Sequence, residues 1–199
     1  MVLVNEERDI DQLLVEQCQG GDIAAFDDLV LRYKDRIYNV VYRFVGHHED
    51  AQDVVQEVFM RAYRGIQDFQ GRSQVYTWLY SIASNLARNA LRDGGRKGRG
   101  QGLSLNRLEE DAPTMAQQAT RVDATPDRIA EQHELNDVLQ ECILLLPEHY
   151  RMVFVLRTFD QLSYDEIAEA LGCPSGTVKS RLNQARALLR DALRERSVV

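Results

Sequence analysis

The stretch SYDEIAEALGCPSGTVKSRLNQARALLR, residues 163–190, decides the fold of the second half of this 199-residue chain. Ser163 and Glu166 have the spacing of a capping box, in which each side chain satisfies a backbone group at the start of a helix. A short helix is therefore predicted to begin here and to end at Gly172, and a longer helix follows. The capped helix, the glycine turn and the second helix together predict a helix-turn-helix over 163–187.

The second helix of this motif has an apolar side and a polar, basic side. The polar types can contact phosphates or base edges in a major groove, and free backbone N–H groups at the helix start favour a phosphate. The alternative is a structural hairpin with a solvated face, but the cap, turn and basic helix together favour DNA binding. The candidate DNA contacts are Ser175, Thr177, Lys179, Ser180, Arg181, Asn183, Gln184 and Arg186.

Almost every other patterned segment has apolar residues three or four positions apart, which predicts an all-α protein. Tyr63 is assigned to the inner face of its helix, and Leu135 and Leu145 to the apolar face of another. The predicted helices cover 9–19, about 23–44, 49–63, 75–92, a segment from near Pro126, one opening at Pro147, 164–171 and 176–194.

The helical pattern stops in the middle of the chain, over residues 94–127. This stretch is rich in glycine, polar and acidic residues, so it cannot bury enough apolar area to offset the cost of ordering. The sequence therefore predicts two small helical domains, 1–93 and 128–199, joined by a flexible acidic linker.

The net charge of −7 argues at first against a nucleic-acid partner. Its distribution changes this interpretation, because residues 72–101 hold six basic residues against one acid and residues 151–199 hold eight against six. The segment between them is strongly acidic. Local field matters more than total charge for binding a polyanion, so two separate DNA contacts are possible.

Several classes of function are disfavoured. The sequence has no apolar run long enough for a membrane span and no secretion signal, so we expect a cytoplasmic protein without a membrane span. The sequence has three cysteines that lie far apart, Cys18, Cys142 and Cys173. We expect them to be free, buried thiols. We expect no catalytic residues, metal or cofactor, and no enzyme, because phosphate-loop, paired-ligand and nucleophile motifs are missing. A metal site at His47-His48-Glu49 is disfavoured because neighbouring helical residues face apart.

The first half carries two further candidate surfaces. The stretch DFQGRSQVYTW, residues 68–78, mixes aromatic, amide and basic residues around a glycine, which suits unstacked bases. Phe69 and Tyr76 fit either base stacking or the core, whereas Trp78 is assigned to the core. The helix over 49–63 has an acidic face, which is either solvated or the docking site of a basic protein.

Four motifs in this order resemble the extracytoplasmic-function sigma factors of bacterial RNA polymerase, of the sigma-E/sigma-W type. They are DAQDVVQEVF at 50–59, FQG at 69–71, YTWLYSIA at 76–83, and LSYDEIA at 162–168 with GTVKSR at 176–181. The resemblance covers nearly all of the chain outside the linker.

The resemblance implies a sigma domain 2 and a sigma domain 4, which together direct promoter-specific transcription initiation. The clamp coiled coil of core polymerase would contact Asp50, Asp53, Gln56, Glu57 and Phe59. The melted −10 element would contact Phe69, Gly71, Arg72, Ser73, Tyr76, Tyr80, Ser81, Asn85 and Arg88. The helix-turn-helix would read the −35 element and its other surface would meet the polymerase flap.

The resemblance also implies an anti-sigma factor as partner, which in some cases would hold the protein at the inner membrane, and a monomer when no partner is bound. Ser81, Lys179 and Arg72 differ from the types common at these positions, which leaves the promoter sequence open. Two alternatives remain at this point. One is a sigma-like decoy that sequesters an anti-sigma protein, and the other is a simple helix-turn-helix repressor or activator.

Overall fold

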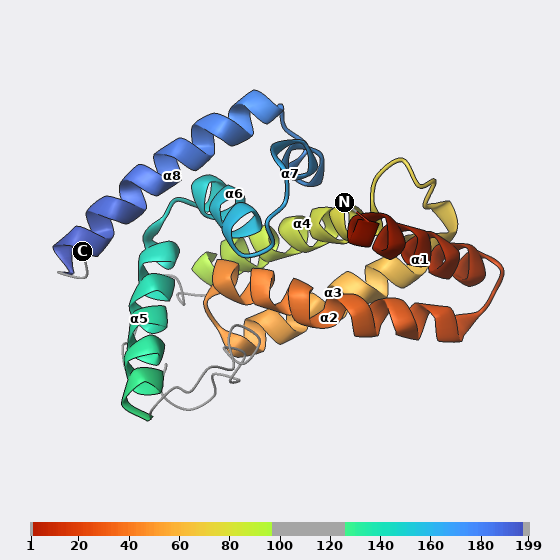
Figure 1. Cartoon of the computed structure of the whole chain (residues 1–199), viewed down its shortest axis with the longest axis horizontal. Helices are drawn as coiled ribbons and strands as arrows, with labels where there is room; N and C mark the ends of the chain where they lie inside the picture. The colour runs from red at the N-terminus through yellow and green to blue at the C-terminus, as the bar shows by residue number, and fades with distance from the viewer. Residues whose placement is uncertain (1, 97–125, 197–199) are drawn as a thin grey trace.

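The computed structural model of the protein describes residues 2–96 and 126–196, with side chains over 8–92 and 135–196. Every regular element within these ranges is helical (Figure 1), which confirms the all-α prediction. The helices are α1 (Val2–Gln19), α2 (Ile23–Val45), α3 (His48–Gly65), the short 3-10 turn η1 (Ile66–Asp68), α4 (Val75–Arg96), α5 (Pro126–Leu145), α6 (Glu148–Thr158), α7 (Tyr164–Leu171) and α8 (Ser175–Glu195).

The first unit, residues 2–96, is built around α2, which packs against α1, α3 and α4. Its apolar residues recur every three or four positions, so one broad stripe faces the core. Asp22 caps the helix start by accepting a hydrogen bond from the Ala24 N–H at 2.9 Å. Gly46 ends the helix in the left-handed region at φ 82°, where its N–H donates to the Tyr42 carbonyl.

The second unit, residues 126–196, contains the helix-turn-helix. The predicted capping box is present, because the Ser163 hydroxyl accepts from the Glu166 N–H and the Glu166 carboxylate accepts from the Ser163 N–H. Gly172 ends α7 at φ 62°, as the turn requires. Pro174 then precedes α8, which packs its apolar side against α6 and α7.

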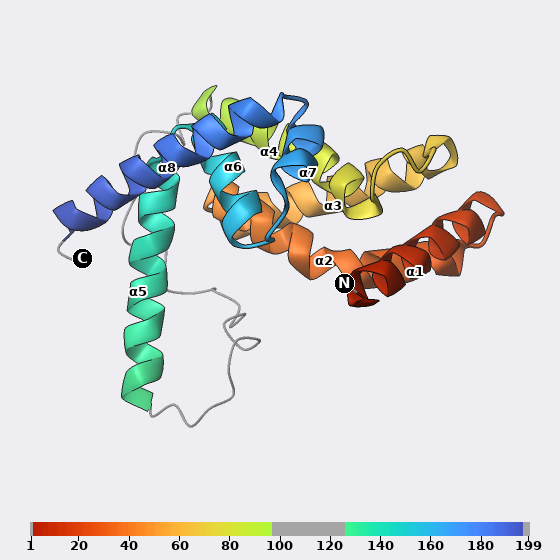
Figure 2. The same cartoon turned by 45° about the horizontal axis from the view of Figure 1, so that its top comes forward.

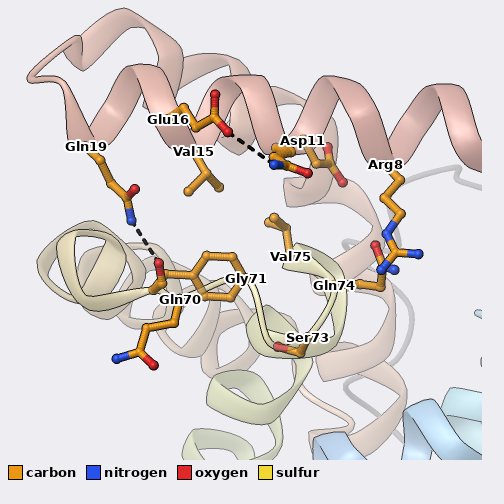
Figure 3. Close-up of a pocket in the computed structure, with 12 residues that line it drawn as sticks. Arg8, Asp11, Val15, Glu16, Gln19, Gln70, Gly71, Ser73, Gln74 and Val75 are labelled. Atoms are coloured by element: carbon orange, nitrogen blue, oxygen red, sulfur yellow. Dashed lines mark hydrogen bonds between the residues drawn. The ribbon is translucent and has the colours of Figure 1, made fainter.

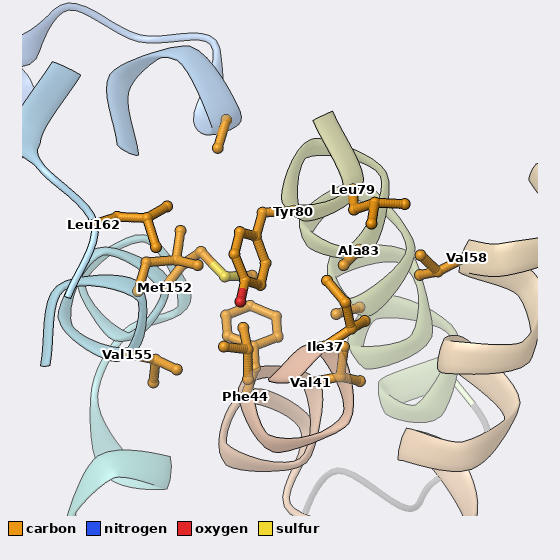
Figure 4. Packing of buried hydrophobic residues seen from close by; sticks show 14 of the residues in the cluster. Ile37, Val41, Phe44, Val58, Leu79, Tyr80, Ala83, Met152, Val155 and Leu162 are labelled. Carbon is orange, nitrogen blue, oxygen red and sulfur yellow. The ribbon is translucent and has the colours of Figure 1, made fainter. Parts of the chain in front are cut away.

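The two units pack on each other and share one continuous hydrophobic core. Helices α6 and α7 lie against α2 and α4, and α5 also contacts α2 (Figures 1 and 2). Figure 4 shows Tyr80 of α4 between Phe44 of the first unit and Met152 of the second. The side chains of α2 and α4 are therefore buried partly by their own unit and partly by the second one.

Some element boundaries differ from the sequence prediction. Helix α1 begins at Val2 rather than at residue 9, since no glycine or proline interrupts residues 2–8. Helix α4 continues to Arg96 and α5 begins at Pro126, so most of the predicted linker lies outside the described residues.

Three apolar residues assigned to core faces are exposed, and for these residues the prediction was wrong. Tyr63 is 49% exposed, and its ring makes an edge-to-face contact with that of Phe26 at a centroid distance of 5.1 Å. Leu135 and Leu145 are each 53% exposed. Figure 2 shows the first part of α5 extending away from the other helices, so side chains there have few neighbours to pack against.

Replacing Gly46 tests the contact between the units. A Cβ on Gly46 would lie 2.7 Å from the Leu144 Cδ1 atom, whereas one on Gly21, also at positive φ, would meet nothing within 4 Å. Gly21→Ala should cost about 1–2 kcal/mol through its backbone conformation alone. Gly46→Ala should cost about 1 kcal/mol more, because the Leu144 side chain must move away from the new methyl group. Urea unfolding followed by circular dichroism measures both variants, and equal losses would contradict the close approach of Leu144.

Candidate nucleic-acid and polymerase interfaces

Helix α8 lies along the outer edge of the second unit (Figure 1). The residues on its polar side are exposed or half-buried. Its apolar side is anchored by Val178, Leu182, Ala185 and Leu189, all of which are buried. Among the predicted contact residues, Lys179, Ser180, Asn183, Gln184 and Arg186 are exposed, and Ser175, Thr177 and Arg181 are half-buried. The structure therefore brings all eight residues to an accessible helix, as direct readout of a major groove requires.

The predicted polymerase-binding residues lie along α3. Asp53 and Gln56 are exposed, and Asp50, Glu57 and Phe59 are half-buried. Glu57 pairs with Arg61 one turn later at 2.7 Å, so part of the acidic charge on this face is already compensated. Met60 and Tyr63 are the large apolar side chains exposed on the same helix, and the sequence prediction did not include them in this surface.

The predicted −10 residues lie on the loop after η1 and along α4, but not all of them are accessible. Gly71, Arg72 and Asn85 are exposed, and Ser73 and Ser81 are half-buried. Phe69 is half-buried, with its ring centroid 4.8 Å from that of Trp78, which supports the core interpretation for part of its surface. The remaining three residues, Tyr76, Tyr80 and Arg88, are engaged by the second unit.

Tyr80 is fully buried, with 0% of its surface exposed. It cannot contact DNA in this arrangement, because the second unit covers it (Figure 4). Its hydroxyl has no hydrogen-bond partner among the described residues, and burial of such a group is costly, about 1–3 kcal/mol. Access to Tyr80 therefore requires the two units to separate.

Tyr76 and Arg88 make polar contacts to the second unit. The Tyr76 hydroxyl donates to the Glu166 carboxylate, the same group that caps α7, and Arg88 pairs with Glu148 at 2.8 Å. Burial and this hydrogen bond raise the pKa of Tyr76. Burial alone would raise the pKa of Glu166, but the hydrogen bonds from Tyr76 and Ser163 outweigh it and lower that pKa. Tyr76, a predicted contact of the −10 element, is thus hydrogen-bonded to the residue that caps the first helix of the helix-turn-helix.

Two arginines reinforce the contact between the units. Arg151 donates to the Phe44 carbonyl at 2.6 Å and also to the carbonyls of Leu144 and Leu146. The guanidinium of Arg43 lies 3.7 Å from the centre of the Phe159 ring, a cation–π contact. These groups join the end of α2 to α5 and α6.

A hollow of about 410 Å³ lies between α1 and the loop at residues 69–75 (Figure 3). Residues of α1 make one wall, and the loop makes the other. The predicted −10 residues Phe69, Gly71 and Ser73 contribute to it. The α1 residues Arg8, Asp11, Gln12, Val15, Glu16 and Gln19 also line it. The sequence prediction missed the α1 wall because α1 and the loop are about 50 residues apart along the chain.

No group of three or more metal-ligand side chains is placed to hold an ion in the part of the chain that the structure describes. His48 instead hydrogen-bonds to the Tyr38 hydroxyl and to Gln52. All three cysteines are unbridged, with Cys18 and Cys142 buried and Cys173 half-buried. Across the described ranges, no helix is both long and apolar enough for a membrane span.

Comparisons with known proteins agree with both units. A family model described as Sigma-70 region 2 matches residues 29–97, and one described as Sigma-70, region 4 matches residues 136–189. The RNA polymerase sigma-H factor of Pseudomonas aeruginosa is 41% identical over 184 residues, which cover 92% of this chain and 93% of that protein. The ECF RNA polymerase sigma-E factor of Escherichia coli K12 is 41% identical over 176 residues, 88% of this chain and 90% of that one.

Two solved structures resemble the whole described fold. CnrH in complex with the cytosolic domain of CnrY has a TM-score of 0.68 and 25% identity, over 94% of this chain and 98% of that one. The sigma factor RpoE in complex with the anti-sigma factor NepR, from Bartonella quintana, has a TM-score of 0.64 and 23% identity, over 86% and 98%. The second likeness is evidence for the fold alone.

A capped helix-turn-helix joined to a second helical unit is typical of DNA-binding proteins that act in transcription. The chain belongs to the extracytoplasmic-function (ECF) group of sigma-70-type RNA polymerase sigma factors. The predicted class is confirmed, and with it the predicted role in promoter-directed transcription initiation. A simple helix-turn-helix regulator is excluded, because the region 2 match covers most of the first unit.

A charge swap tests whether the two units hold each other. The Arg36 Nε atom lies 3.2 Å from Asp160 Oδ1, and these side chains are 41% and 9% exposed. Arg36→Asp would place two carboxylates together, and Asp160→Arg would place two cations together, so each variant should separate the units. The Arg36→Asp/Asp160→Arg double variant should bring them back together.

Fluorescence energy transfer between dyes on the two units measures the separation. Because Arg36 is partly exposed, each single change should cost less than the 3–5 kcal/mol of breaking a fully buried pair. If the double variant is as open as the single ones, the ion pair does not contribute to the contact.

Proposed function

We propose that three surfaces of this sigma factor divide the work of initiation. Helix α8 reads the −35 element, the loop at 69–75 with α4 engages the melted −10 strand, and α3 docks on the clamp coiled coil of core polymerase. The single observation that carries this division is the outward polar face of α8, which its buried apolar side holds firmly in place. The protein supplies no covalent chemistry in this scheme.

The packing of the two units supports a further step in this function. In the described arrangement α8 is accessible, whereas Tyr80 is covered and Tyr76 is bonded to Glu166. The part of the −10 surface that holds Tyr76 and Tyr80 can therefore act only after the units separate, and core polymerase would stabilise the separated form. The chain alone should accordingly bind promoter DNA weakly.

Docking on polymerase is proposed for the α3 face and for the flap-facing side of the second unit. The exposed acidic and amide groups of α3, together with the apolar Met60 and Tyr63, suit a partner that presents both basic and apolar groups. An exposed apolar contact surrounded by charged residues is typical of a protein interface.

An anti-sigma partner is proposed as the regulator. CnrH, which this chain resembles over 94% of its length, has been solved in complex with the cytosolic domain of CnrY. We propose that a partner of this kind stabilises the packed arrangement of this chain. The sigma factor acts in the cytoplasm, and a membrane-bound partner would hold it at the inner membrane. A sigma-like decoy would bind such a partner without initiating transcription.

Substituting an exposed glutamine of α3 tests the polymerase interface. Gln56→Lys should weaken association with core polymerase about tenfold, because it introduces a cation where a basic partner is expected. Gln17→Lys is the matched control, since Gln17 is also exposed but lies on α1, outside the proposed surface. Association is measured by fluorescence anisotropy, and initiation by run-off transcription. Equal effects of the two variants would contradict the proposed surface, and a wild-type chain inactive in run-off transcription would favour the decoy.

The exposed Asn183 tests base readout by α8. Asn183→Ala should relax base preference at one position of the −35 element by about 1–3 kcal/mol, because its amide can bond to a base edge. Asn136→Ala is the control, since Asn136 is exposed on α5 and outside the helix-turn-helix. Transcription from a randomised −35 library measures the preference. An unchanged consensus for Asn183→Ala would remove this residue from the reading surface.

A further inference from the structure

The loop that joins η1 to α4 is held at its start by the end of α1. The Gln19 side-chain N–H₂ group donates to the carbonyls of Ile66 and Phe69, at 2.9 Å each. In return, the Gln67 side-chain amide donates to the Cys18 carbonyl at 3.1 Å. Three hydrogen bonds thus connect the last turn of α1 to a segment about 50 residues further along the chain.

The same helix also reaches the far end of the loop. In the amide orientation that satisfies both groups, the Gln74 side-chain oxygen accepts from Arg8 Nε at 2.8 Å and from Nη2 at 3.0 Å. Helix α1 therefore lies along the loop and contacts it at both ends, as the labelled Gln19, Gln74 and Arg8 in Figure 3 show. The middle of the loop, with Gly71 and Arg72, is exposed between these two contacts.

These contacts are separate from those that hold α1 in the fold. Val15 and Cys18 are buried in the core, and the buried Asp11 accepts hydrogen bonds from Tyr33 and from Arg32. Helix α1 would therefore stay packed on α2 if Gln19 lost its hydrogen bonds to the loop. The Gln19 contacts serve the conformation of the loop rather than the placement of α1.

We propose that Gln19 is a positioning residue for recognition of the melted promoter strand. It holds the loop at 69–74 in the conformation that receives unpaired bases, with Arg8 supporting the far end, and α1 forms the second wall of the hollow. A loop ordered in advance loses less conformational entropy on binding, so these contacts raise affinity without touching DNA. This inference rests on the proposed −10 role of the loop.

The test uses the full chain bound to core polymerase. Gln19→Glu keeps the side-chain size but replaces the donor with acceptor oxygens that face two carbonyls. Gln17→Glu adds the same charge to an exposed position of the same helix and is the matched control. Gln19→Met removes the donor without adding charge, and thermal unfolding by circular dichroism shows that each variant is folded.

Strand opening is measured by permanganate reactivity of thymines in the −10 region, and base preference by a panel of −10 substitutions. Both Gln19 variants should reduce opening about tenfold and relax base preference, as the loss of two hydrogen bonds predicts. Core binding and −35 recognition should match those of Gln17→Glu. A purely structural role would lower thermal stability but leave base preference unchanged.

Loop variants distinguish failure of this inference from failure of the proposed function. Ser73→Ala and Arg72→Ala alter the loop itself. If they impair opening while both Gln19 variants behave like Gln17→Glu, the positioning role is overturned and the −10 role of the loop survives. If the loop variants leave opening and base preference unchanged, both proposals are overturned.

Discussion

The burial of α4 on two sides is the constraint on which the rest of this structure depends. Leu79 points towards Val58 of α3 within the first unit, whereas Tyr80 points towards Met152 of the second unit (Figure 4). Adjacent helical residues face different directions, so one layer cannot cover both side chains. The second unit supplies the missing layer, and the two units therefore form one core although each carries its own helices.

Because of this shared core, the two proposed DNA-binding surfaces differ in accessibility. Helix α8 contributes its apolar side to the second unit and leaves its polar side in solvent. The tyrosines of α4, in contrast, are used to hold the units together through burial and through the bond from Tyr76 to Glu166. A group that contacts the other unit is unavailable to a base. Because of this packing, the −10 element can reach the tyrosines of α4 only when the two units separate.

Helix α1 shows how a segment outside the recognisable motifs can belong to a recognition site. No pattern in residues 2–19 indicates contact with nucleic acid, because its amphipathic spacing explains its packing on α2. Its polar residues nevertheless meet both ends of the loop at 69–74 and line the hollow beside it. The lining of that hollow carries charges of both signs, because Arg8 stands beside the acids Asp11 and Glu16.

The sequence by itself determined the all-α class, the helix-turn-helix with its Ser163–Glu166 cap, and most helix ends. These features depend on helical periodicity and on hydrogen bonds between residues three or four apart, which are visible in a linear pattern. Only the tertiary structure decided that Tyr80 is buried, that Leu135 and Tyr63 are exposed, and that Gln19 meets Phe69. These outcomes depend on side chains 50 or more residues apart, or on where a packed layer ends, and neither leaves a local signal in the chain.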